Sequence, residues 1–324
     1  GDVPQSYTGN EPSTMRAIRN GYDPYLIVMN RLEQFVLLGH NPQKVELIIQ
    51  GGTFPALDHE YQESVIEDCF KAMNDFSELF FTPEFDFERF KEFFELPRDK
   101  RDKELALKIQ DKLLAIKKKT TLEEEHLKNE TTAIRCVGLT IETKPDWGLL
   151  EHGNHMLKLG CTRVELGVQT VYEHALKSTN RGHTVADTIK SMRILKDLGF
   201  KINAHLMPGL PGVTYDEDLA GLKQIFTDPD YRPDLLKIYP CQVAPGTPLF
   251  YKWKKGEFKP IDADTAAKML PNFKETIPEY ARVQRILRDV PTKYWADGVE
   301  FTNLRQYIHH KYKPKCRCIR CREP

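Results

Sequence analysis

The chain has 324 residues, a length that suits two average domains or one α/β barrel. Its 47 Lys and Arg residues balance its 47 Asp and Glu residues, so a uniformly basic nucleic-acid coat is excluded, whereas a local basic surface is not. Hydrophobic residues form 40% of the chain, which is enough for a buried core, and no stretch reaches the roughly 20 apolar residues of a membrane helix.

Short apolar runs alternate with amphipathic stretches between residues 45 and 239. Strands are predicted at 45–50, 134–141, 163–168, 202–207 and 235–239. Helices are predicted between them at 58–74, 147–159, 184–198 and 215–226. Buried strands separated by helices form right-handed βαβ units, so the pattern predicts an α/β fold with a parallel sheet, as in a partial (β/α) barrel.

The segment 97–130 interrupts this alternation because it is highly charged, with a Lys run at 117–119 and a Glu run at 123–125. Its pattern favours a solvated helix with many ion pairs. A mobile cover or an RNA-facing insertion is the alternative interpretation.

The pattern changes again after Pro260. A helix is predicted at 262–276, a half-exposed strand at 282–288, and a helix start at Thr302-Asn303. We therefore predict a barrel core over 1–258 and a small basic appendage over 259–324.

Polar side chains gather where the predicted strands end. In parallel α/β barrels the active site lies at the C-terminal ends of the strands. A Gly-Gly pair or a single His is weak support by itself, but together these residues predict a binding site on one rim. The rim comprises Gly51, Gly52, Thr53, Glu142, Lys144, Gln169, His205 and Tyr239.

Several motifs carry a resemblance that covers nearly the whole chain. They are the segments 6–12 (SYTGNEP), 15–19 (MRAIR), 51–54 (GGTF), 140–146 (TIETKPD), 163–170 (RVELGVQT), 180–184 (NRGHT) and 283–285 (VQR). The chain resembles the catalytic subunit of Elongator, and its archaeal form in particular. That family consists of radical S-adenosylmethionine enzymes on a partial barrel, which carboxymethylate carbon 5 of the wobble uridine of tRNA with acetyl-CoA as the carbon source.

The resemblance implies roles for the rim. Gly51, Gly52 and Thr53 would receive the methionine end of S-adenosylmethionine. The side chains of Glu142, Gln169 and His205 would hold its ribose and amino-acid parts, with Lys144 and Tyr239 as pocket walls. It also implies the partners: a tRNA anticodon stem-loop, and other Elongator-like subunits or a second copy of the chain.

The chain departs from the family pattern at both ends. The cysteine run that binds the [4Fe-4S] cluster lies upstream of residue 3 in the family, and the acetyltransferase-like domain that handles acetyl-CoA follows residue 324. We therefore expect this polypeptide to lack the cluster, which leaves its catalytic residues unknown, and to be inactive by itself.

Three of the seven cysteines, Cys316, Cys318 and Cys321, stand close together near the end of the chain. Gaps of one and two residues strain a disulfide, whereas thiolates at this spacing can share one soft metal ion. With His309, His310 or a cysteine from elsewhere in the chain as a candidate fourth ligand, the spacing favours a structural zinc site over an unmetallated tail or an iron site. The thiols lie far from the rim in sequence, so we do not expect them to replace the missing cluster cysteines.

Basic residues near the same end could form a phosphate-binding surface for an RNA loop. The alternative is ordinary solvated charge, and the resemblance favours RNA. The predicted cations are Arg282, Arg285, Arg288, Lys311, Lys313, Lys315, Arg317 and Arg320.

Two functions follow from these patterns. The first is the core of a radical tRNA-modifying enzyme. The second is a zinc-stabilised tRNA-binding or scaffold module without catalysis.

Residues 1–6 lack the basic and apolar regions of a signal peptide, and the other four cysteines stand singly. We therefore predict a cytoplasmic protein without a membrane partner.

Overall fold

The computed structural model describes residues 7, 9–99, 101–288, 290–301 and 303–323. The chain divides into two compact units. The barrel unit comprises Gly1–Pro12, Ile49–Ala56 and Thr140–Pro324, and the helical unit comprises Ser13–Ile48 and Leu57–Leu139. Ser6 and Thr8 of the N-terminal motif and Thr302 of the predicted helix start lie outside the described residues.

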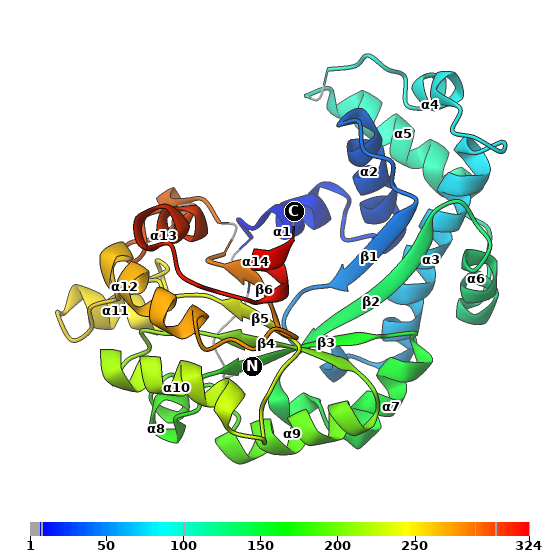
Figure 1. Cartoon of the computed structure of the whole chain (residues 1–324). Helices are drawn as coiled ribbons and strands as arrows, with labels where there is room; N and C mark the ends of the chain where they lie inside the picture. Colours follow the sequence, from blue (N-terminus) through cyan, green and yellow to red (C-terminus); the bar gives the residue numbers. More distant parts are fainter. Residues whose placement is uncertain (1–6, 8, 100, 289, 302, 324) are drawn as a thin grey trace. The chain divides into compact units, whose positions relative to one another are not determined.

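Six strands form one sheet whose spatial order follows the sequence (Figure 1). They are β1 (Lys44–Ile49), β2 (Arg135–Thr143), β3 (Arg163–Gln169), β4 (Lys201–Leu206), β5 (Leu235–Ile238) and β6 (Arg282–Ile286). The pairs from β2 to β6 are parallel. Among the described strands β6 does not pair with β1, so the barrel is open. The predicted α/β partial barrel is confirmed, and each predicted strand lies within two residues of the observed one.

Helices follow the strands of the barrel unit, and Figure 1 shows α7, α9 and α10 along one face of β3 to β5. The starts of α9 and α10 are fixed by capping boxes, in which Thr184 pairs with Asp187 and Thr214 pairs with Glu217. The helices of this unit are α7 (Leu150–Lys158), α8 (Glu173–Ser178), α9 (Val185–Asp197), α10 (Tyr215–Thr227), α11 (Pro248–Lys254), α12 (Ala263–Lys274), α13 (Leu304–Tyr312) and α14 (Ile319–Arg322). Short 3₁₀ turns lie at Phe54–Ala56, Pro145–Trp147 and Thr292–Tyr294.

The core of the barrel unit lies between the sheet and these helices. Val164 and Leu166 of β3 and Ile202 and Ala204 of β4 are fully buried. In both strands these apolar residues alternate with polar residues or glycine, so each strand has an apolar face toward the helices and a more polar face away from them. The polar side chains of the second face include those of the candidate site.

The helical unit is built around a long helix, α3 (His59–Phe80). Its other helices are α1 (Pro12–Arg19), α2 (Pro24–Leu37), α4 (Phe87–Phe93), α5 (Lys103–Ile116) and α6 (Leu122–Asn129). Phe76, Phe80 and Phe90 pack their rings together in its fully buried core. The ring centroids of Phe76 and Phe80 lie 4.7 Å apart in an edge-on arrangement, which is a favoured geometry for aromatic pairs.

The charged segment 97–130 forms α5 and α6. The predicted ion pairs are present, because Lys117 meets Asp68 at 2.6 Å and Lys128 meets Glu78 at 2.7 Å. The segment is not merely solvated, however. Glu125 of α6 is buried and accepts a hydrogen bond of 2.6 Å from the amide of Asn74 on α3.

Candidate functional site

A buried polar network occupies the strands of the barrel unit, with Glu165 of β3 at its centre. The side chain of Glu165 is fully buried and accepts hydrogen bonds from three neighbouring groups. The donors are Nε2 of His205 on β4 at 2.9 Å, Nδ2 of Asn203 at 3.0 Å, and the ammonium of Lys237 on β5. Burial would raise the pKa of Glu165, but the hydrogen bonds and positive charge of His205 and Lys237 hold it below its usual value. Glu165 is therefore a carboxylate in this network.

Glu142 of β2 extends the same network. Its Oε2 accepts a hydrogen bond of 2.6 Å from the Tyr7 hydroxyl, and its Oε1 lies 4.0 Å from Nζ of Lys237. Burial raises the pKa of Glu142, with a further contribution from the nearby charge of Glu165. The two carboxyl groups thus differ in proton affinity, an arrangement that acid–base sites commonly use.

Glu142, Glu165 and His205 could also hold a metal ion, because one ligand atom from each lies within 4.8 Å of the others. The Lys237 ammonium already supplies the positive charge between the two carboxylates. A metal ion would have to displace it, so the observed geometry does not favour a metal at this position.

The glycine pair that follows β1 has positive φ angles at both residues. The φ angles of Gly51 and Gly52 are +142° and +101°, a backbone conformation that residues other than Gly rarely adopt. A Cβ at either position would meet no atom within 4 Å, so the space beside the backbone is open.

A second polar cluster lies where β2 and β3 end. Nζ of Lys144 meets Oδ2 of Asp146 at 3.1 Å. Gln169, the last residue of β3, has a φ of +66°. Both Gln169 and Arg181 crowd Gly167, since a Cβ there would lie 2.7 Å from a terminal nitrogen of Arg181. Gly167 therefore permits a close approach that any larger residue would prevent.

His183 belongs to this cluster and is 5% exposed. Neither ring nitrogen has a partner with hydrogen-bond geometry, although the backbone at Val168 is near enough to affect its pKa weakly. Burial and the charge of Arg181 lower the pKa of His183 to about 4. Oδ1 of Asp146 and Nε of Arg181 are also buried without a partner. Buried polar atoms are normally paired, so these atoms indicate a place where a polar ligand can be received.

The structure brings part of the predicted rim together. Glu142 and His205 join one network, and the Tyr239 ring packs edge-on against His205 at 5.6 Å between ring centroids. Lys144 and Gln169 belong to the cluster at the ends of β2 and β3. Five further residues of these clusters were not predicted from the sequence as site residues: Tyr7, Glu165, Arg181, His183 and Lys237.

The three clustered thiols also converge. Sulfur atoms of Cys316, Cys318 and Cys321 all lie within 4.8 Å of one another. Cys318 is fully buried, and hydrogen bonding from the Cys316 thiol lowers its pKa. Nε2 of His309 lies 3.9 Å from Sγ of Cys321, and the buried ammonium of Lys274 lies 3.5 Å from the same sulfur. Three convergent thiols suit a soft divalent ion. Nε2 of His309 also meets the Lys274 ammonium at 2.5 Å, so a metal ion held by His309 would have to displace that ammonium, whereas His310 is exposed.

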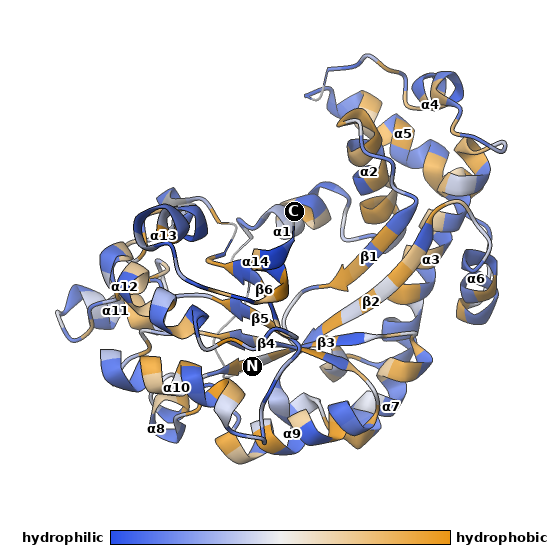
Figure 2. Ribbon diagram, viewed as in Figure 1, coloured by the Kyte–Doolittle hydropathy of each residue, from blue (hydrophilic) through white to orange (hydrophobic). Residues whose placement is uncertain are grey.

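Most of the predicted RNA-binding cations have carboxylate partners. The pairs are Arg282 and Arg320 with Glu323, Arg288 with Glu11, Lys311 with Asp264, and Arg317 with Glu279. Arg285, Lys313 and Lys315 are exposed, and the backbone N–H of Lys315 donates to Glu275. Figure 2 shows that α13 is mainly hydrophilic, as expected for a solvated surface. RNA binding by these residues stays a prediction.

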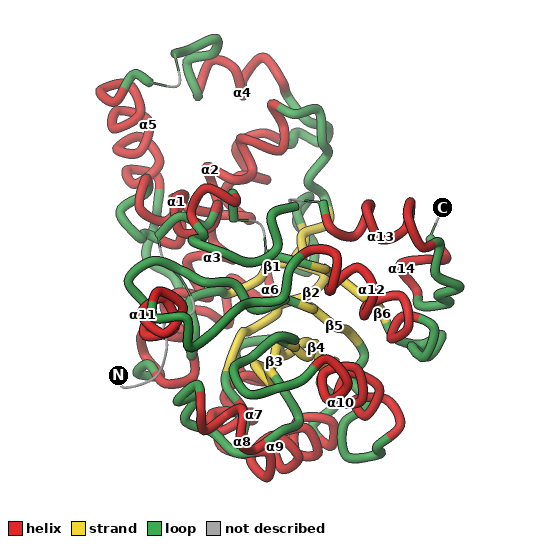
Figure 3. The backbone as a smooth tube through the Cα atoms, turned by 90° about the vertical axis from the view of Figure 1, so that its left-hand side faces the viewer, coloured by secondary structure: helices red, strands yellow, loops and turns green. Residues whose placement is uncertain are grey.

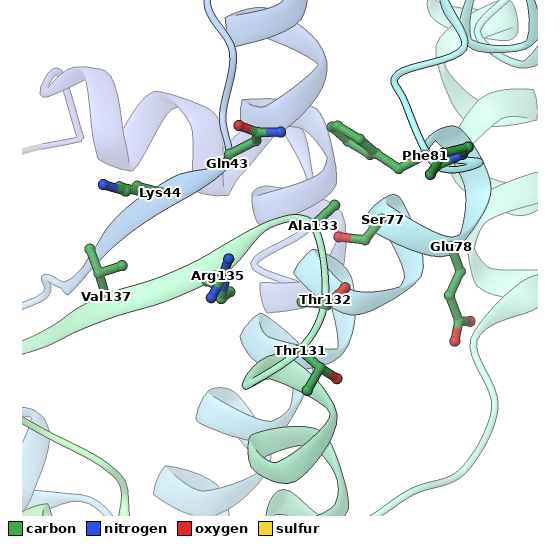
Figure 4. Close-up of a pocket in the computed structure, with 11 residues that line it drawn as sticks. Gln43, Lys44, Ser77, Glu78, Phe81, Thr131, Thr132, Ala133, Arg135 and Val137 are labelled. Atoms are coloured by element: carbon green, nitrogen blue, oxygen red, sulfur yellow. The ribbon is translucent and has the colours of Figure 1, made fainter.

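The helical unit has a separate pocket of about 650 Å³ beside α3 and the first residues of β1 and β2 (Figure 4). Its two cations, Lys44 and Arg135, are exposed. Ser77 is satisfied because it donates to the carbonyl of Met73 and accepts from the N–H of Ile134. No described lining residue has a buried polar atom without a partner, so no feature of this pocket points to a bound ligand.

Comparison with known proteins identifies the fold. Residues 7–222 match the family model described as the radical SAM superfamily, and residues 233–313 match the radical SAM C-terminal domain. Among solved structures, the archaeal Methanocaldococcus infernus Elp3 with an N-terminal deletion is 41% identical, with a TM-score of 0.80. The match covers 94% of this chain and 63% of that one.

Curated relatives are similar along the whole chain. The tRNA uridine(34) acetyltransferase of Methanocaldococcus infernus is 45% identical over 100% of this chain and 53% of its own length. Elongator complex protein 3 of Homo sapiens is 37% identical over 98% of this chain and 51% of its own length. The chain thus spans about half the length of these relatives.

None of the helices that the structure describes is both long enough and apolar enough to cross a membrane.

The family matches cover most of the chain, and the predicted partial barrel is present, with Gly51 and Gly52 shortly after β1, whose last residue is Ile49. The chain therefore belongs to the radical SAM superfamily, with archaeal tRNA uridine(34) acetyltransferase and Elp3 as close homologues.

Proposed function

We propose that this chain forms the radical SAM core of an enzyme that carboxymethylates carbon 5 of the wobble uridine of tRNA, with acetyl-CoA as the carbon source. The observation that carries the proposal is the 45% identity to a tRNA uridine(34) acetyltransferase over the full chain. The open barrel with a polar rim supports it, because parallel barrels bind ligands at the C-terminal ends of their strands.

S-adenosylmethionine is the ligand that the rim would take. The backbone of Gly51, Gly52 and Thr53 leaves room for its amino-acid end. The remaining predicted contacts are Glu142, Lys144, Gln169, His205 and Tyr239. To these we add Arg181 and His183, because their unpaired buried nitrogens lie in the Lys144 cluster. When bound, S-adenosylmethionine with an iron–sulfur cluster would supply the one-electron chemistry, while the protein orients the ligand and excludes water.

Binding of S-adenosylmethionine to the 324-residue chain, measured by isothermal titration calorimetry, tests this assignment. Replacement of Gln169 by Ala should weaken binding, whereas replacement of the exposed Lys190 on α9 should leave it unchanged. Absence of binding by the wild-type chain, or equal binding by Gln169→Ala, would contradict the assignment.

We also propose that the polypeptide of this sequence is not catalytically competent by itself. The close cysteine set that it contains is Cys316, Cys318 and Cys321, and the other four cysteines stand singly. Anaerobic reconstitution with iron and sulfide should therefore yield no stoichiometric four-iron cluster. Formation of such a cluster would show that this part of the proposal is wrong.

A second candidate function is a zinc-stabilised tRNA-binding or scaffold module. The observation that favours it is the convergence of the three thiols with His309 beside them. Zinc there would fix a short segment that has no core of its own. Elongator-like subunits or a second copy would be the protein partners. A cytoplasmic location remains a prediction from the single cysteines.

A further inference from the structure

Four exposed lysines lie on helix α11 and directly after it, without an ion pair to a carboxylate among the described residues. These are Lys252, Lys254, Lys255 and Lys259, of which Lys259 is near enough to Asp262 for its charge to lower the pKa of that carboxyl group. The segment 247–259 contains these four lysines and one acidic residue, Glu257, which gives it a formal charge of +3. Unpaired ammonium groups keep their full charge available for an external anion.

Aromatic side chains lie among these lysines. The Tyr251 ring is 57% exposed. Phe250 stacks on Trp253 with 5.6 Å between ring centroids, and the Lys254 ammonium lies 4.7 Å above the Phe250 ring. Alternation of lysines with an accessible ring is the arrangement by which proteins bind single-stranded nucleic acid: the cations meet phosphates and the ring stacks on a base.

The helix is held in place by contacts on its inner side. Nε1 of Trp253 donates a hydrogen bond of 2.8 Å to Oδ2 of Asp297. The backbone that precedes α11 is tied to the same loop, since the N–H of Val243 donates to the carbonyl of Asp297 at 3.0 Å and the N–H of Ala296 donates to the carbonyl of Val243 at 2.8 Å. These anchors orient α11 before any ligand arrives, which reduces the entropy lost on binding.

The position of α11 connects this surface to the rim. Thr247 caps the helix a few residues after Tyr239 at the end of β5. Figures 1 and 3 place α11 on the side of the barrel unit toward which the strands point, which is the side that carries the strand-end residues. A strand bound along α11 would therefore present its bases on the side of the candidate site.

We infer that α11, through Tyr251 and Lys252, Lys254, Lys255 and Lys259, is a contact surface for single-stranded RNA such as an open loop. The inference rests on the proposed function for the identity of the nucleic acid. An anionic membrane is a poorer fit, because Phe250 and Trp253 are engaged with each other and with Asp297 and do not form an exposed apolar face.

A labelled RNA hairpin with an open loop is the probe, and its affinity for the 324-residue chain is measured by fluorescence anisotropy at several salt concentrations. The test variant carries Lys252→Gln, Lys254→Gln and Lys255→Gln. Each phosphate contact contributes about 0.7 to the slope of log affinity against log salt for a single strand. The triple variant should lower that slope by about 2 and the affinity at 0.1 M salt by about a hundredfold.

The matched control removes three other exposed cations of the same unit, with Lys158→Gln, Lys190→Gln and Arg193→Gln on α7 and α9. It changes the net charge equally and should alter affinity by less than about threefold. A separate Tyr251→Ala variant should weaken binding to the loop by at least about fivefold, and Tyr251→Phe should restore it.

Wild-type slope and affinity in the Lys triple variant, or equal losses in the matched control, would overturn the inference. So would failure of the wild-type chain to bind the RNA, or binding of anionic lipid vesicles in its place. Calorimetry with S-adenosylmethionine on the same variants separates the two proposals. If the Lys triple variant binds both S-adenosylmethionine and RNA as the wild-type chain does, the α11 surface alone is refuted. If the wild-type chain does not bind S-adenosylmethionine, the proposed function alone is refuted.

Discussion

Replacement of Lys237 by Met should reveal how far the barrel unit depends on its buried ion pair. The side chain of Lys237 is 5% exposed and that of Glu165 is fully buried, so water cannot solvate Glu165 when the ammonium is removed. Breaking a buried pair by removal of one partner destabilises proteins by about 3–5 kcal/mol. His205 and Asn203 still donate to Glu165, so we expect about 3 kcal/mol, the lower end of that range.

The measurement is the free energy of unfolding from urea denaturation, with the single variants Lys237→Met and Glu165→Gln and the double variant. The Gln side chain keeps an oxygen that can accept hydrogen bonds but carries no charge. The double variant should therefore be more stable than the sum of the single effects implies, with a coupling energy of about 2 kcal/mol.

Lys201→Met is the matched control, because Lys201 pairs with Asp234 at 3.0 Å but is 70% exposed. An exposed pair is worth about 1 kcal/mol at most. If Lys237→Met destabilises the chain no more than Lys201→Met, or if the single effects simply add, the buried carboxylate is not what makes Lys237 important.

Three further predictions concern the candidate sites. His183→Gln should remove a pH dependence of stability, because the pKa of His183 is about 4 in the folded chain and about 6.5 in the unfolded chain. Between pH 7.5 and pH 5.5 the wild-type chain should lose about 1.3 kcal/mol more free energy of unfolding than the variant, and parallel urea-unfolding profiles would contradict this. Gly167→Ala should destabilise by about 1–3 kcal/mol and weaken S-adenosylmethionine binding, because its Cβ would lie 2.7 Å from Arg181; normal calorimetric binding would count against the cluster as a ligand site. Cys318→Ser should lower the zinc content measured by mass spectrometry well below one per chain, and an unchanged content would exclude Cys318 as a ligand.

The strands of the barrel were predictable because their periodicity reports burial. Runs such as 163–169 place an apolar residue at every second position, and this alternation indicates a strand with one apolar face. The helical unit was not recognised as a separate unit. Its sequence is divided by the segment 49–56, which belongs to the barrel unit, so no continuous stretch marks it.

The candidate site was predictable where a residue lies at or near the C-terminal end of a strand, as Glu142, Gln169 and His205 do. Gly51, Gly52 and Gln169 stand at strand ends, where the position alone suggests a role. Glu165 and Lys237 lie within strands, and a charged residue there does not reveal that another strand supplies its partner. Helix α11 escaped prediction because seven residues are too few for a helical period to be recognised.

The hydrogen bond between Tyr7 and Glu142 joins residues 135 positions apart, and the whole helical unit lies between them in the sequence. The barrel unit therefore cannot form this hydrogen bond during synthesis until Glu142 on β2 has been added to the chain. Contacts of such long sequence separation slow folding, since the entropy of a large loop must be lost before they form. We expect the helical unit to acquire protection from hydrogen exchange first, with the interior of the barrel closing last during refolding.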